Sequence, residues 1–582
     1  MRMWVKRVGF RTLHPMRNPF RRAAAAFVAG HTGMDPTAFP VTEPPSHATG
    51  DYAVGCFPAG KALRKNPAQV AKEVAAAFTP RDGLAKAAAS GPFVNFSVDR
   101  SALADGVLGE VEKQGADWGT TSGGRGKTVV LDYSSPNIAK HLAYHHIRST
   151  MIGNALARLH RACGWTVVGI NHLGDWGTTF GMLLVAWERW SAPGEAPTVD
   201  RLNDLYVRFR AAAKDDPALE EAARARFAAL EAGDPAARAL WQEFRRVSLE
   251  EFQQVYDLLG VSFDLVMGES AFEELLGPVV EMLRSKGLVS ESEGAEVVDL
   301  SADKMPPCLL RKKDGATLYA TRDIAAALWR YEHHAFDRAL YVVDRGQELH
   351  FRQWIRVLEK AGFPFARHIE HVSFGMVRFE GRRTGTRTGN ILCLRDVLDE
   401  AAGAILERIR EKNPDLPGKD EVARQVGTGA IVFADLSTQR DKDVDFEWER
   451  ILSFEGDTGP YVQYAHARAA SILRRAPAGL PAAEPRRLVL PEEASVLKWI
   501  ADFPDRVEWA AAAAEPFHVG SYLLDLCSAF SRWYDLGNRD PALKVLCEDP
   551  EVAAARLALV RAVRATLARG LDLLGIAAPE EM

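Results

Sequence analysis

The stretch from Thr128 to Ile170 restricts the fold of this chain more than any other, because strand-like and helix-like patterns alternate within it. Residues Thr128–Asp132 are apolar and partly β-branched, which is typical of a buried strand. The polar residues 134–137 then interrupt the strand, and a helical pattern opens in which Met151, Ala155 and Leu159 share one face. A second strand follows at Trp165–Ile170. The order predicts a βαβ unit of an α/β sheet, whose polar loop lies near a helix N-terminus, where phosphate and carboxylate groups are held. An ordinary crossover without a ligand is the alternative.

Length and composition predict a globular protein of several domains. The chain has 582 residues, which is long for one core, so we expect two to four domains. Charged residues make up 26% and the formal net charge is −5, so a large RNA partner would need a local basic face. The six cysteines are far apart and form no C-x-x-C pair, which predicts no zinc site and a reducing compartment. No apolar run approaches the roughly 20 residues that span a bilayer.

The pattern along the chain divides it into three parts. Residues from about 17 to 118 form a first module, with a helix expected at Asn66–Phe78 and a strand at Gly91–Phe96. Residues 127–400 are expected to form the α/β domain, with strands returning near Glu296–Leu300 and Ala339–Asp344. A helical insertion is predicted within this domain, at about 195–260, because the segment is dense in Ala, Glu and Arg at helical spacing. Residues 421–582 are largely helical in pattern.

The N-terminal end is basic, with no acidic residue before Asp35. It resembles a signal peptide only faintly, because its apolar part is short and leads into no cleavage-like site. We expect Met16 to be the natural start and the protein to be cytoplasmic.

Seven short sequence words occur in one order along nearly the whole chain. They are Asp132–Lys140 (DYSSPNIAK), Asn171–Gly177 (NHLGDWG), Gly268–Ser270 (GES), Tyr319–Asp323 (YATRD), Gln347–His350 (QELH), Ser373–Val377 (SFGMV) and Leu452–His466 (LSFEG followed by PYVQYAH). In this order they resemble the class I arginyl-tRNA synthetases. The resemblance implies a Rossmann-like α/β catalytic domain, an α+β N-terminal domain that contacts tRNA, and an all-α C-terminal anticodon-binding domain.

Residues that suit an arginine pocket lie in these words. A guanidinium is planar and always charged, so a specific pocket needs acidic and hydrogen-bonding groups in a fixed arrangement. The resemblance assigns six residues to L-arginine: Ser135, Asn137, Glu269, Tyr319, Asp323 and Gln347. On a helix, Tyr319 and Asp323 would face the same way. The alternative is that Asp323 only pairs with Arg322 or another neighbour on a solvated surface.

Two loops are expected to bind ATP, and both depart from the family pattern. The first word, normally His-x-Gly-His, falls on Ala143-Tyr144-His145-His146, so only His146 is retained. A glycine at position 145 would let adenine pack against bare backbone, and here a histidine side chain stands instead. His141 or His145 could replace the lost imidazole. The second word, normally Lys-Met-Ser-Lys, falls on residues 383–386, where its second lysine is Thr386.

The resemblance implies that Lys140 substitutes for the missing lysine. It makes Lys140, His146, Arg383 and Arg387 the catalytic set, which would supply positive or donor groups to the phosphates. The ATP-binding residues it implies are Ala143, His145, His146, Met376 and Arg383. The alternative for the second loop is an exposed basic hairpin.

Aromatic residues in the helical part are expected to bind tRNA. Tyr461 and Tyr464 lie one helical turn apart and could stack on unpaired bases, although such a pair is more often part of a core. The resemblance also implies that Tyr534 and Met582 lie near the anticodon. In the first module it implies that Phe93 and Asn95 meet the tRNA elbow.

The predicted function is therefore arginyl-tRNA synthesis from ATP, L-arginine and tRNA(Arg), with Mg2+ accompanying ATP and no zinc. A monomer with no membrane contact is expected. The alternative is a paralogue that binds tRNA or arginine without efficient charging, which Ala143 and His145 motivate. A nucleotidyltransferase acting on a small metabolite would not explain the helical C-terminal part.

Overall fold

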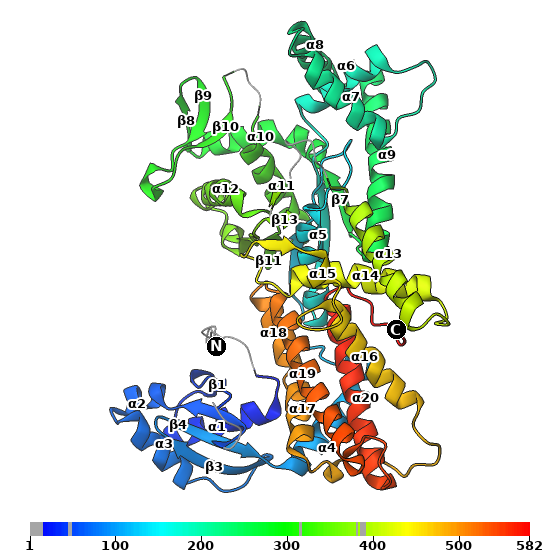
Figure 1. The fold of residues 1–582 in the computed structure, drawn as a ribbon. Coiled ribbons are helices and arrows are strands. Elements are labelled where there is room, and N and C mark those ends of the chain that lie inside the picture. Colours follow the sequence, from blue (N-terminus) through cyan, green and yellow to red (C-terminus); the bar gives the residue numbers. More distant parts are fainter. Residues whose placement is uncertain (1–15, 45–48, 314–316, 380–381, 384–391) are drawn as a thin grey trace.

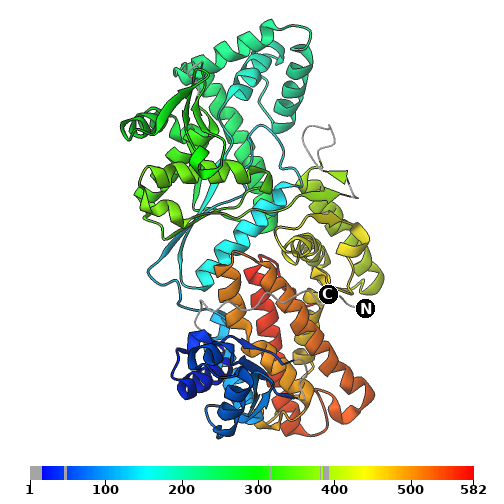
Figure 2. The ribbon, with the colours of Figure 1, turned by 90° about the vertical axis from the view of Figure 1, so that its left-hand side faces the viewer.

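The computed structural model describes residues 16–44, 49–313, 317–379, 382–383 and 392–582. Figure 1 shows the chain as an elongated molecule with the α/β part at one end and two smaller parts at the other. The N-terminal module and the C-terminal helices lie side by side at that lower end, an arrangement that Figure 2 shows from a second direction.

The N-terminal module is an antiparallel sheet covered by helices. Its four strands, in the order β1-β2-β4-β3, are Val41–Thr42, Tyr52–Gly55, Phe93–Val98 and Leu84–Ser90. The helices are α1 (Pro19–Thr32), α2 (Phe57–Leu63), α3 (Pro67–Ala76) and α4 (Arg100–Gln114). The side chain of Asn66 caps α3, so the predicted helix begins one residue later than expected. Strand β3 was not predicted, because its Ala-rich sequence has helical propensity, and pairing along β4 decides its structure.

A five-stranded parallel sheet forms the centre of the α/β domain. Its order is β12-β11-β5-β6-β7, with the strands Ile369–His371, Arg338–Tyr341, Thr128–Asp132, Thr166–Leu173 and Leu265–Gly268. All four strand pairs are parallel. The helices α5 (His146–Ala162), α10 (Glu273–Ser285), α11 (Tyr319–His334) and α12 (Glu348–Lys360) accompany the strands. Strand β5 pairs with β6 on one side and β11 on the other, so the strand order reverses there, which is where open α/β sheets bind ligands.

One predicted strand belongs to a different sheet. The segment near Glu296–Leu300 was expected to complete the α/β sheet, but it forms β9 (Ala295–Val298) in a three-stranded antiparallel sheet. Its neighbours are β8 (Val289–Ser292) and β10 (Cys308–Arg311). That prediction was wrong because a short β-branched run does not reveal its pairing partner. The second half of the parallel sheet contains β11, which falls within the predicted Ala339–Asp344 region, and β12.

A helical insertion separates β6 from β7. It comprises α6 (Thr178–Trp190), α7 (Val199–Ala212), α8 (Ala218–Glu231) and α9 (Pro235–Leu259). Helix α9 has 25 residues, with the Asp234 side chain as its N-cap and Gly260 in the left-handed conformation at its end. In Figure 1, α9 descends from the insertion along the sheet toward α13 (Leu394–Lys412).

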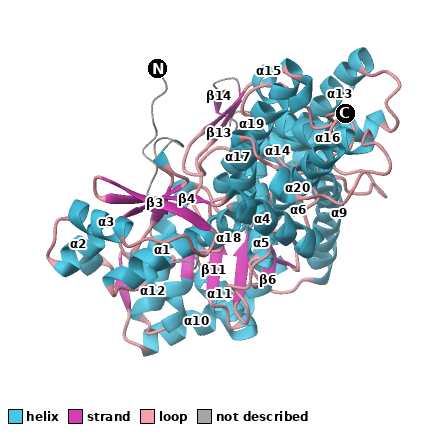
Figure 3. Ribbon diagram, turned by 90° about the horizontal axis from the view of Figure 1, so that it is seen from below, coloured by secondary structure: helices cyan, strands magenta, loops and turns pink. Residues whose placement is uncertain are grey.

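The C-terminal part is a bundle of helices, seen from below in Figure 3. They are α14 (Lys419–Leu436), α15 (Trp448–Ile451), α16 (Gly459–Arg474), α17 (Pro491–Ala501), α18 (Phe503–Ala512), α19 (Phe517–Arg539) and α20 (Pro550–Leu573). Leu557, Val560, Val563, Leu567 and Leu571 of α20 are all buried, as the predicted apolar stripe requires. A small sheet joins β13 (Val377–Phe379) to β14 (Arg382–Arg383) and β15 (Val444–Phe446).

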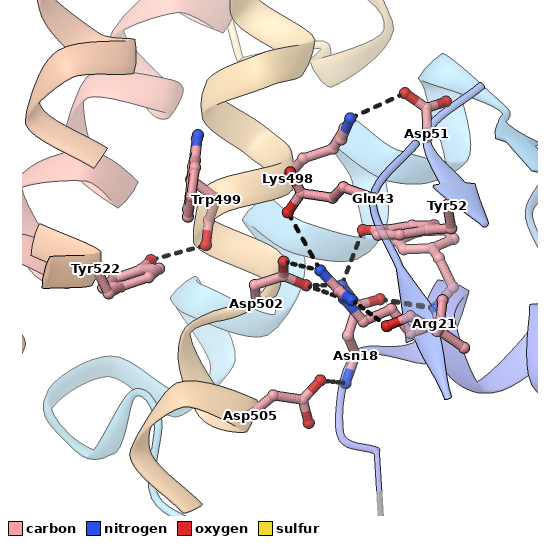
Figure 4. Close-up of polar contacts among 12 residues, drawn as sticks. Asn18, Arg21, Glu43, Asp51, Tyr52, Lys498, Trp499, Asp502, Asp505 and Tyr522 are labelled. Carbon is pink, nitrogen blue, oxygen red and sulfur yellow. Dashed lines mark hydrogen bonds and ion pairs between the residues drawn. The ribbon is translucent and has the colours of Figure 1, made fainter. Parts of the chain in front are cut away.

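Buried charges join the N-terminal module to the helical bundle (Figure 4). Arg21 of α1 donates to both carboxylate oxygens of Asp502, at 2.8 and 2.6 Å, and Asn18 donates to the same carboxylate at 2.6 Å. Lys498 of α17 pairs with Asp51 at 3.2 Å. These groups are almost fully enclosed, so the contact between the two parts is specific rather than a solvated surface pair.

Candidate active site

The predicted site residues of the α/β domain gather at the carboxyl edge of the parallel sheet. The loop of residues 133–145 follows β5, Asn171 and His172 lie at the end of β6, Glu269 follows β7, and Asp344 follows β11. Parallel strands present these ends at one edge, which explains why words far apart in the sequence meet.

The loop after β5 has a strained backbone held by polar contacts. Ser134, Ser135 and Ala139 have φ angles of 70°, 50° and 62°, which non-glycine residues rarely adopt. The Ser134 hydroxyl contacts Tyr256 of α9 at 2.9 Å. The Ser135 hydroxyl donates to Asp132 at 2.8 Å, and its amide donates to the Asn171 side chain at 3.2 Å. The surrounding structure therefore imposes this loop conformation.

Asn137 is exposed at the tip of this loop, where its neighbours fix the backbone against Gly174. Gly174 donates to the Pro136 carbonyl at 3.0 Å, and Ile138 donates to the Gly174 carbonyl at 3.2 Å. A Cβ on Gly174 would lie 1.9 Å from Oδ1 of Asn137, so a larger residue at position 174 would displace the Asn137 carboxamide. Asn137 is exposed, so its carboxamide is accessible to a ligand.

In the altered first ATP word, the imidazole of His146 is held by contacts with the backbone of Ala143. Nδ1 of His146 lies 3.0 Å from the amide nitrogen and 3.1 Å from the carbonyl oxygen of Ala143, so that position contributes through its backbone. Burial, with the nearby His145 and Lys140, lowers the pKa of His146 to about 3, so its imidazole is neutral. His145 lies beside it with ring centroids 4.2 Å apart, at the start of α5.

Lys140 and His141 face the helical insertion. Nζ of Lys140 lies 4.9 Å from the ring centroid of Tyr206 in α7. Nδ1 of His141 lies 2.6 Å from Glu251, and its Nε2 lies 3.0 Å from Asp200. Both ring nitrogens of His141 therefore face carboxylates of the insertion.

Acidic groups converge where arginine is expected to bind. Burial raises the pKa of Glu269 to about 7; Arg322 opposes this shift and the nearby Asp323 adds to it. Oδ2 of Asp323 lies 2.5 Å from Nε2 of His350. Arg322 pairs instead with Glu273 at 3.1 Å and lies 3.9 Å from Glu269, so the alternative in which Asp323 pairs with Arg322 is wrong. Asp323 and Glu269 form the anionic part of the site.

Two uncharged residues predicted for the pocket lie at its rim. Tyr319 begins α11 one turn before Asp323, and its side chain is 66% exposed. Gln347 is also exposed, just before α12. Both side chains are therefore accessible to a ligand that Glu269 and Asp323 hold.

Asp132, His172 and Asp175 at this edge received no role from the sequence, although all three lie within the quoted words. Asp175 is fully buried and accepts from the amide and hydroxyl of Ser270, at 3.0 and 2.9 Å. Asp132 pairs with the buried Arg330 at 2.8 Å, and Arg330 also contacts His172. These contacts fix the β5, β6 and β7 ends relative to one another. The fixed spacing of Asp175 within NHLGDWG was the available signal.

The second ATP loop is described only at its base. The Met376 amide donates to Asp443 at 3.0 Å, and its carbonyl accepts from Val444 at 2.9 Å. Arg383 is part of β14, but its side chain lies outside the described part, and Arg387 and Thr386 lie outside the described residues. Beyond the loop, Tyr144 donates to the Leu392 carbonyl at 2.8 Å, which joins the segment after the second word to the first word.

Two of the tRNA residues predicted in the bundle, Tyr464 and Tyr534, share a cationic neighbour, Arg468. Tyr464 of α16 is 40% exposed, and the Arg468 guanidinium lies 4.9 Å from its ring and 5.1 Å from the ring of Tyr534 in α19. Tyr461 is partly exposed, with its hydroxyl 3.4 Å from Ser531. Met582 is partly buried against the bundle. Tyr464, Tyr534 and Arg468 offer aromatic and guanidinium faces to a base.

The two residues predicted to meet the tRNA elbow differ in exposure. Phe93 is partly exposed and packs edge-to-face against Phe57 at 5.6 Å. Asn95 is only 5% exposed, because it lies in the central strand β4 between β2 and β3. Phe93 is therefore the surface group of the pair.

No cluster of three or more His, Cys, Asp or Glu side chains suited to a metal ion occurs among the described residues. Within the same ranges, no helix combines the length and apolar character needed to cross a bilayer.

Three family profiles match successive parts of the chain. They are "Arginyl tRNA synthetase N terminal domain" at residues 16–98, "tRNA synthetases class I (R), catalytic domain" at 112–448, and "DALR anticodon binding domain" at 462–582.

Proteins and solved structures that are similar to this chain are named arginine–tRNA ligase or arginyl-tRNA synthetase. The arginine–tRNA ligase of Alkaliphilus metalliredigens (strain QYMF) is 43% identical over 542 residues, covering 93% of this chain and 95% of that protein. That of Clostridium botulinum (strain Alaska E43 / Type E3) is 42% identical, covering 97% and 100%. The structure of the Thermus thermophilus arginyl-tRNA synthetase superposes with a TM-score of 0.83 at 30% identity, covering 97% and 100% of the two chains.

The parallel sheet, its edge site and the helical bundle define an aminoacyl-tRNA ligase of class I. Within that class, the chain belongs to the arginyl-tRNA synthetase family. The predicted fold class and family are confirmed, and ATP is a substrate in this family.

Proposed function

We propose that this protein joins L-arginine to tRNA(Arg) at the carboxyl edge of the parallel sheet. The observation that carries the proposal is the convergence of Glu269 and Asp323, from β7 and α11, beside the strained loop after β5. A partly buried pair of acidic side chains selects a side chain that is always cationic, and the neighbouring loops carry the groups expected at ATP.

In the first step, an arginine carboxylate oxygen attacks the α-phosphorus of ATP. The bond from that phosphorus to the bridging oxygen breaks, so pyrophosphate leaves with both bonding electrons and arginyl-adenylate remains. We assign the tautomer of neutral His146 in which Nδ1 accepts from the Ala143 amide, so that Nε2 carries the proton and donates to a phosphate oxygen of ATP. Lys140, Arg383 and Arg387 supply positive charge to the phosphates, and Mg2+ enters bound to ATP as part of that substrate.

In the second step, a hydroxyl of the terminal ribose of tRNA attacks the arginyl carbonyl, and AMP leaves. Ser135, Asn137, Tyr319 and Gln347 complete the arginine pocket, and Met376 lies with Ala143 and His145 around adenine. Tyr461, Tyr464, Tyr534 and Met582 contact the anticodon loop. At the elbow, Phe93 is the surface group that contacts tRNA, and Asn95 supports that surface from within β4.

We also propose a cytoplasmic monomer whose domains span residues 17–118, 127–400 and 421–582, with the insertion at about 195–260. The chain offers no coiled-coil heptads that would indicate a helical dimer.

The decisive experiment is aminoacylation of purified tRNA(Arg) with labelled arginine and ATP. Charging with arginine, and none with lysine, is expected. Arginine-dependent pyrophosphate exchange should require tRNA, and robust exchange without tRNA would contradict that requirement. Binding of arginine and tRNA(Arg) without charging would favour the non-charging paralogue, which the ligase names of the relatives do not support.

A further inference from the structure

Helix α9 of the insertion contacts the loop after β5, the end of β6 and α13. Ser248 accepts from the Ala139 amide at 2.8 Å, and Tyr256 contacts both Ser134 and Asn171, at 2.9 and 3.1 Å. Gln254 accepts from Arg395 of α13 at 2.6 Å, just beyond the second ATP word. The insertion is therefore a support for the loops and not a separate appendage.

Two adjacent residues of the loop after β5 meet this insertion in different ways. His141 lies between Glu251 of α9 and Asp200 of α7, and both carboxylates raise its pKa; the Glu251 hydrogen bond is the largest cause. Lys140 meets no carboxylate within the described ranges, and its ammonium lies over the ring of Tyr206. Asp200 and Glu251 therefore pair with His141, whereas the Lys140 ammonium contacts the ring of Tyr206.

The kind of partner decides how much of the Lys140 charge remains available to a phosphate. An ion pair would neutralise the lysine toward an incoming phosphate, whereas a ring quadrupole attracts the cation and carries no net charge. Lys140 also acts electrostatically on His146, so its ammonium stays near the first ATP word while it is held. Burial lowers the pKa of Lys140, which shows that the position is partly desolvated.

We propose that Tyr206 is a positioning residue for Lys140, holding its ammonium beside the ATP site with its charge available to the phosphates. The inference rests on the phosphate role of Lys140 proposed above. Tyr206 contacts neither arginine nor ATP in this scheme and acts only through the lysine.

The test compares Tyr206→Phe, Tyr206→Leu and Tyr206→Glu by pyrophosphate exchange with tRNA(Arg) present. Tyr206→Phe keeps the ring and should remain within about twofold of the parent. Tyr206→Leu removes the ring and should lower kcat roughly tenfold, the size of a partly desolvated cation–π contact, with KM for arginine unchanged. Tyr206→Glu should lower kcat at least as much, because it pairs with the lysine and neutralises it.

A matched control breaks another cation–π contact of the insertion. Arg208 of α7, two residues after Tyr206, lies 4.5 Å from the Trp190 ring, so Trp190→Leu tests whether loosening the insertion around α7 by itself lowers kcat. It should leave kcat unchanged. Equal losses in Trp190→Leu and Tyr206→Leu, or equal losses in the Phe and Leu variants, would overturn the proposal.

Lys140→Ala separates this inference from the proposed function. It should lower kcat by about two orders of magnitude, as for loss of one transition-state donor, and Tyr206→Leu should add nothing in that background. A further tenfold loss in the double variant would show that Tyr206 acts by another route. A parent rate for Lys140→Ala would instead reject the phosphate role of the lysine, and with it the purpose of holding it.

Discussion

Nε2 of His350 lies 2.5 Å from Oδ2 of Asp323, so the carboxylate proposed to bind the substrate guanidinium already accepts a hydrogen bond from within the protein. His350 lies in the first turn of α12, and Gln347 is the N-cap residue of that helix. The contact orients the carboxylate before arginine enters, as preorganised sites require.

Replacing Asp323 should mainly affect arginine. Asp323→Asn keeps the shape but removes the charge, so we expect kcat/KM for arginine to fall by about 3 kcal/mol, or more than 100-fold. Steady-state exchange kinetics measure it, and KM for ATP should be unchanged. Unaltered arginine kinetics would place Asp323 outside the pocket.

Glu269 should make arginine binding pH-dependent. Its pKa is raised to about 7, primarily by burial, and a bound guanidinium favours the ionised form, so binding releases a proton. The affinity therefore falls as pH falls through 7, and KM for arginine should rise about tenfold between pH 8 and pH 6. Glu269→Gln should give a higher KM that changes little over this range. An equally steep profile in that variant would assign the titration to another group.

Tyr464 should contribute to tRNA affinity and not to arginine activation chemistry. Tyr464→Ala removes one stacking face and one partner of Arg468, so KM for tRNA should rise about tenfold, within the range for one stacked base. Charging assays with varied tRNA measure it. Val489→Ala, which changes an exposed side chain of the same bundle, is the control. A rise in KM for arginine alone would contradict this role.

The Arg21–Asp502 pair should be important for stability. Asp502→Ala leaves a buried guanidinium short of its counter-charge and should lower the free energy of unfolding by about 3–5 kcal/mol. Urea unfolding measures the change. The double variant Arg21→Met/Asp502→Leu removes both charges and should recover most of the loss. An exposed pair, Lys65 and Glu73, provides the comparison, since Lys65→Ala should cost less than about 1 kcal/mol.

The sequence by itself determined the identity of the groups at the site. Strand β5, its polar loop and α5 were predicted, because apolar periodicity and a polar break are local signals. The order of the words predicted the family, and the resemblance assigned Glu269 and Asp323 to the arginine side chain. The apolar stripe of α20 was equally local.

Only the tertiary structure decided what each group contacts. Ala-rich β3 is a strand because it pairs with β4, and β9 pairs with its neighbours β8 and β10 instead of joining the parallel sheet; the side-chain pattern of each segment does not encode these pairings. Burial raised the pKa of Glu269 and enclosed Asn95, neither of which a local pattern contains. The insertion folds back onto the loop after β5. Its position there pairs His141 with Asp200 and Glu251 and places Tyr206 against Lys140. Contacts between segments separated by 50 residues or more arise from packing, and packing is a property of the folded chain.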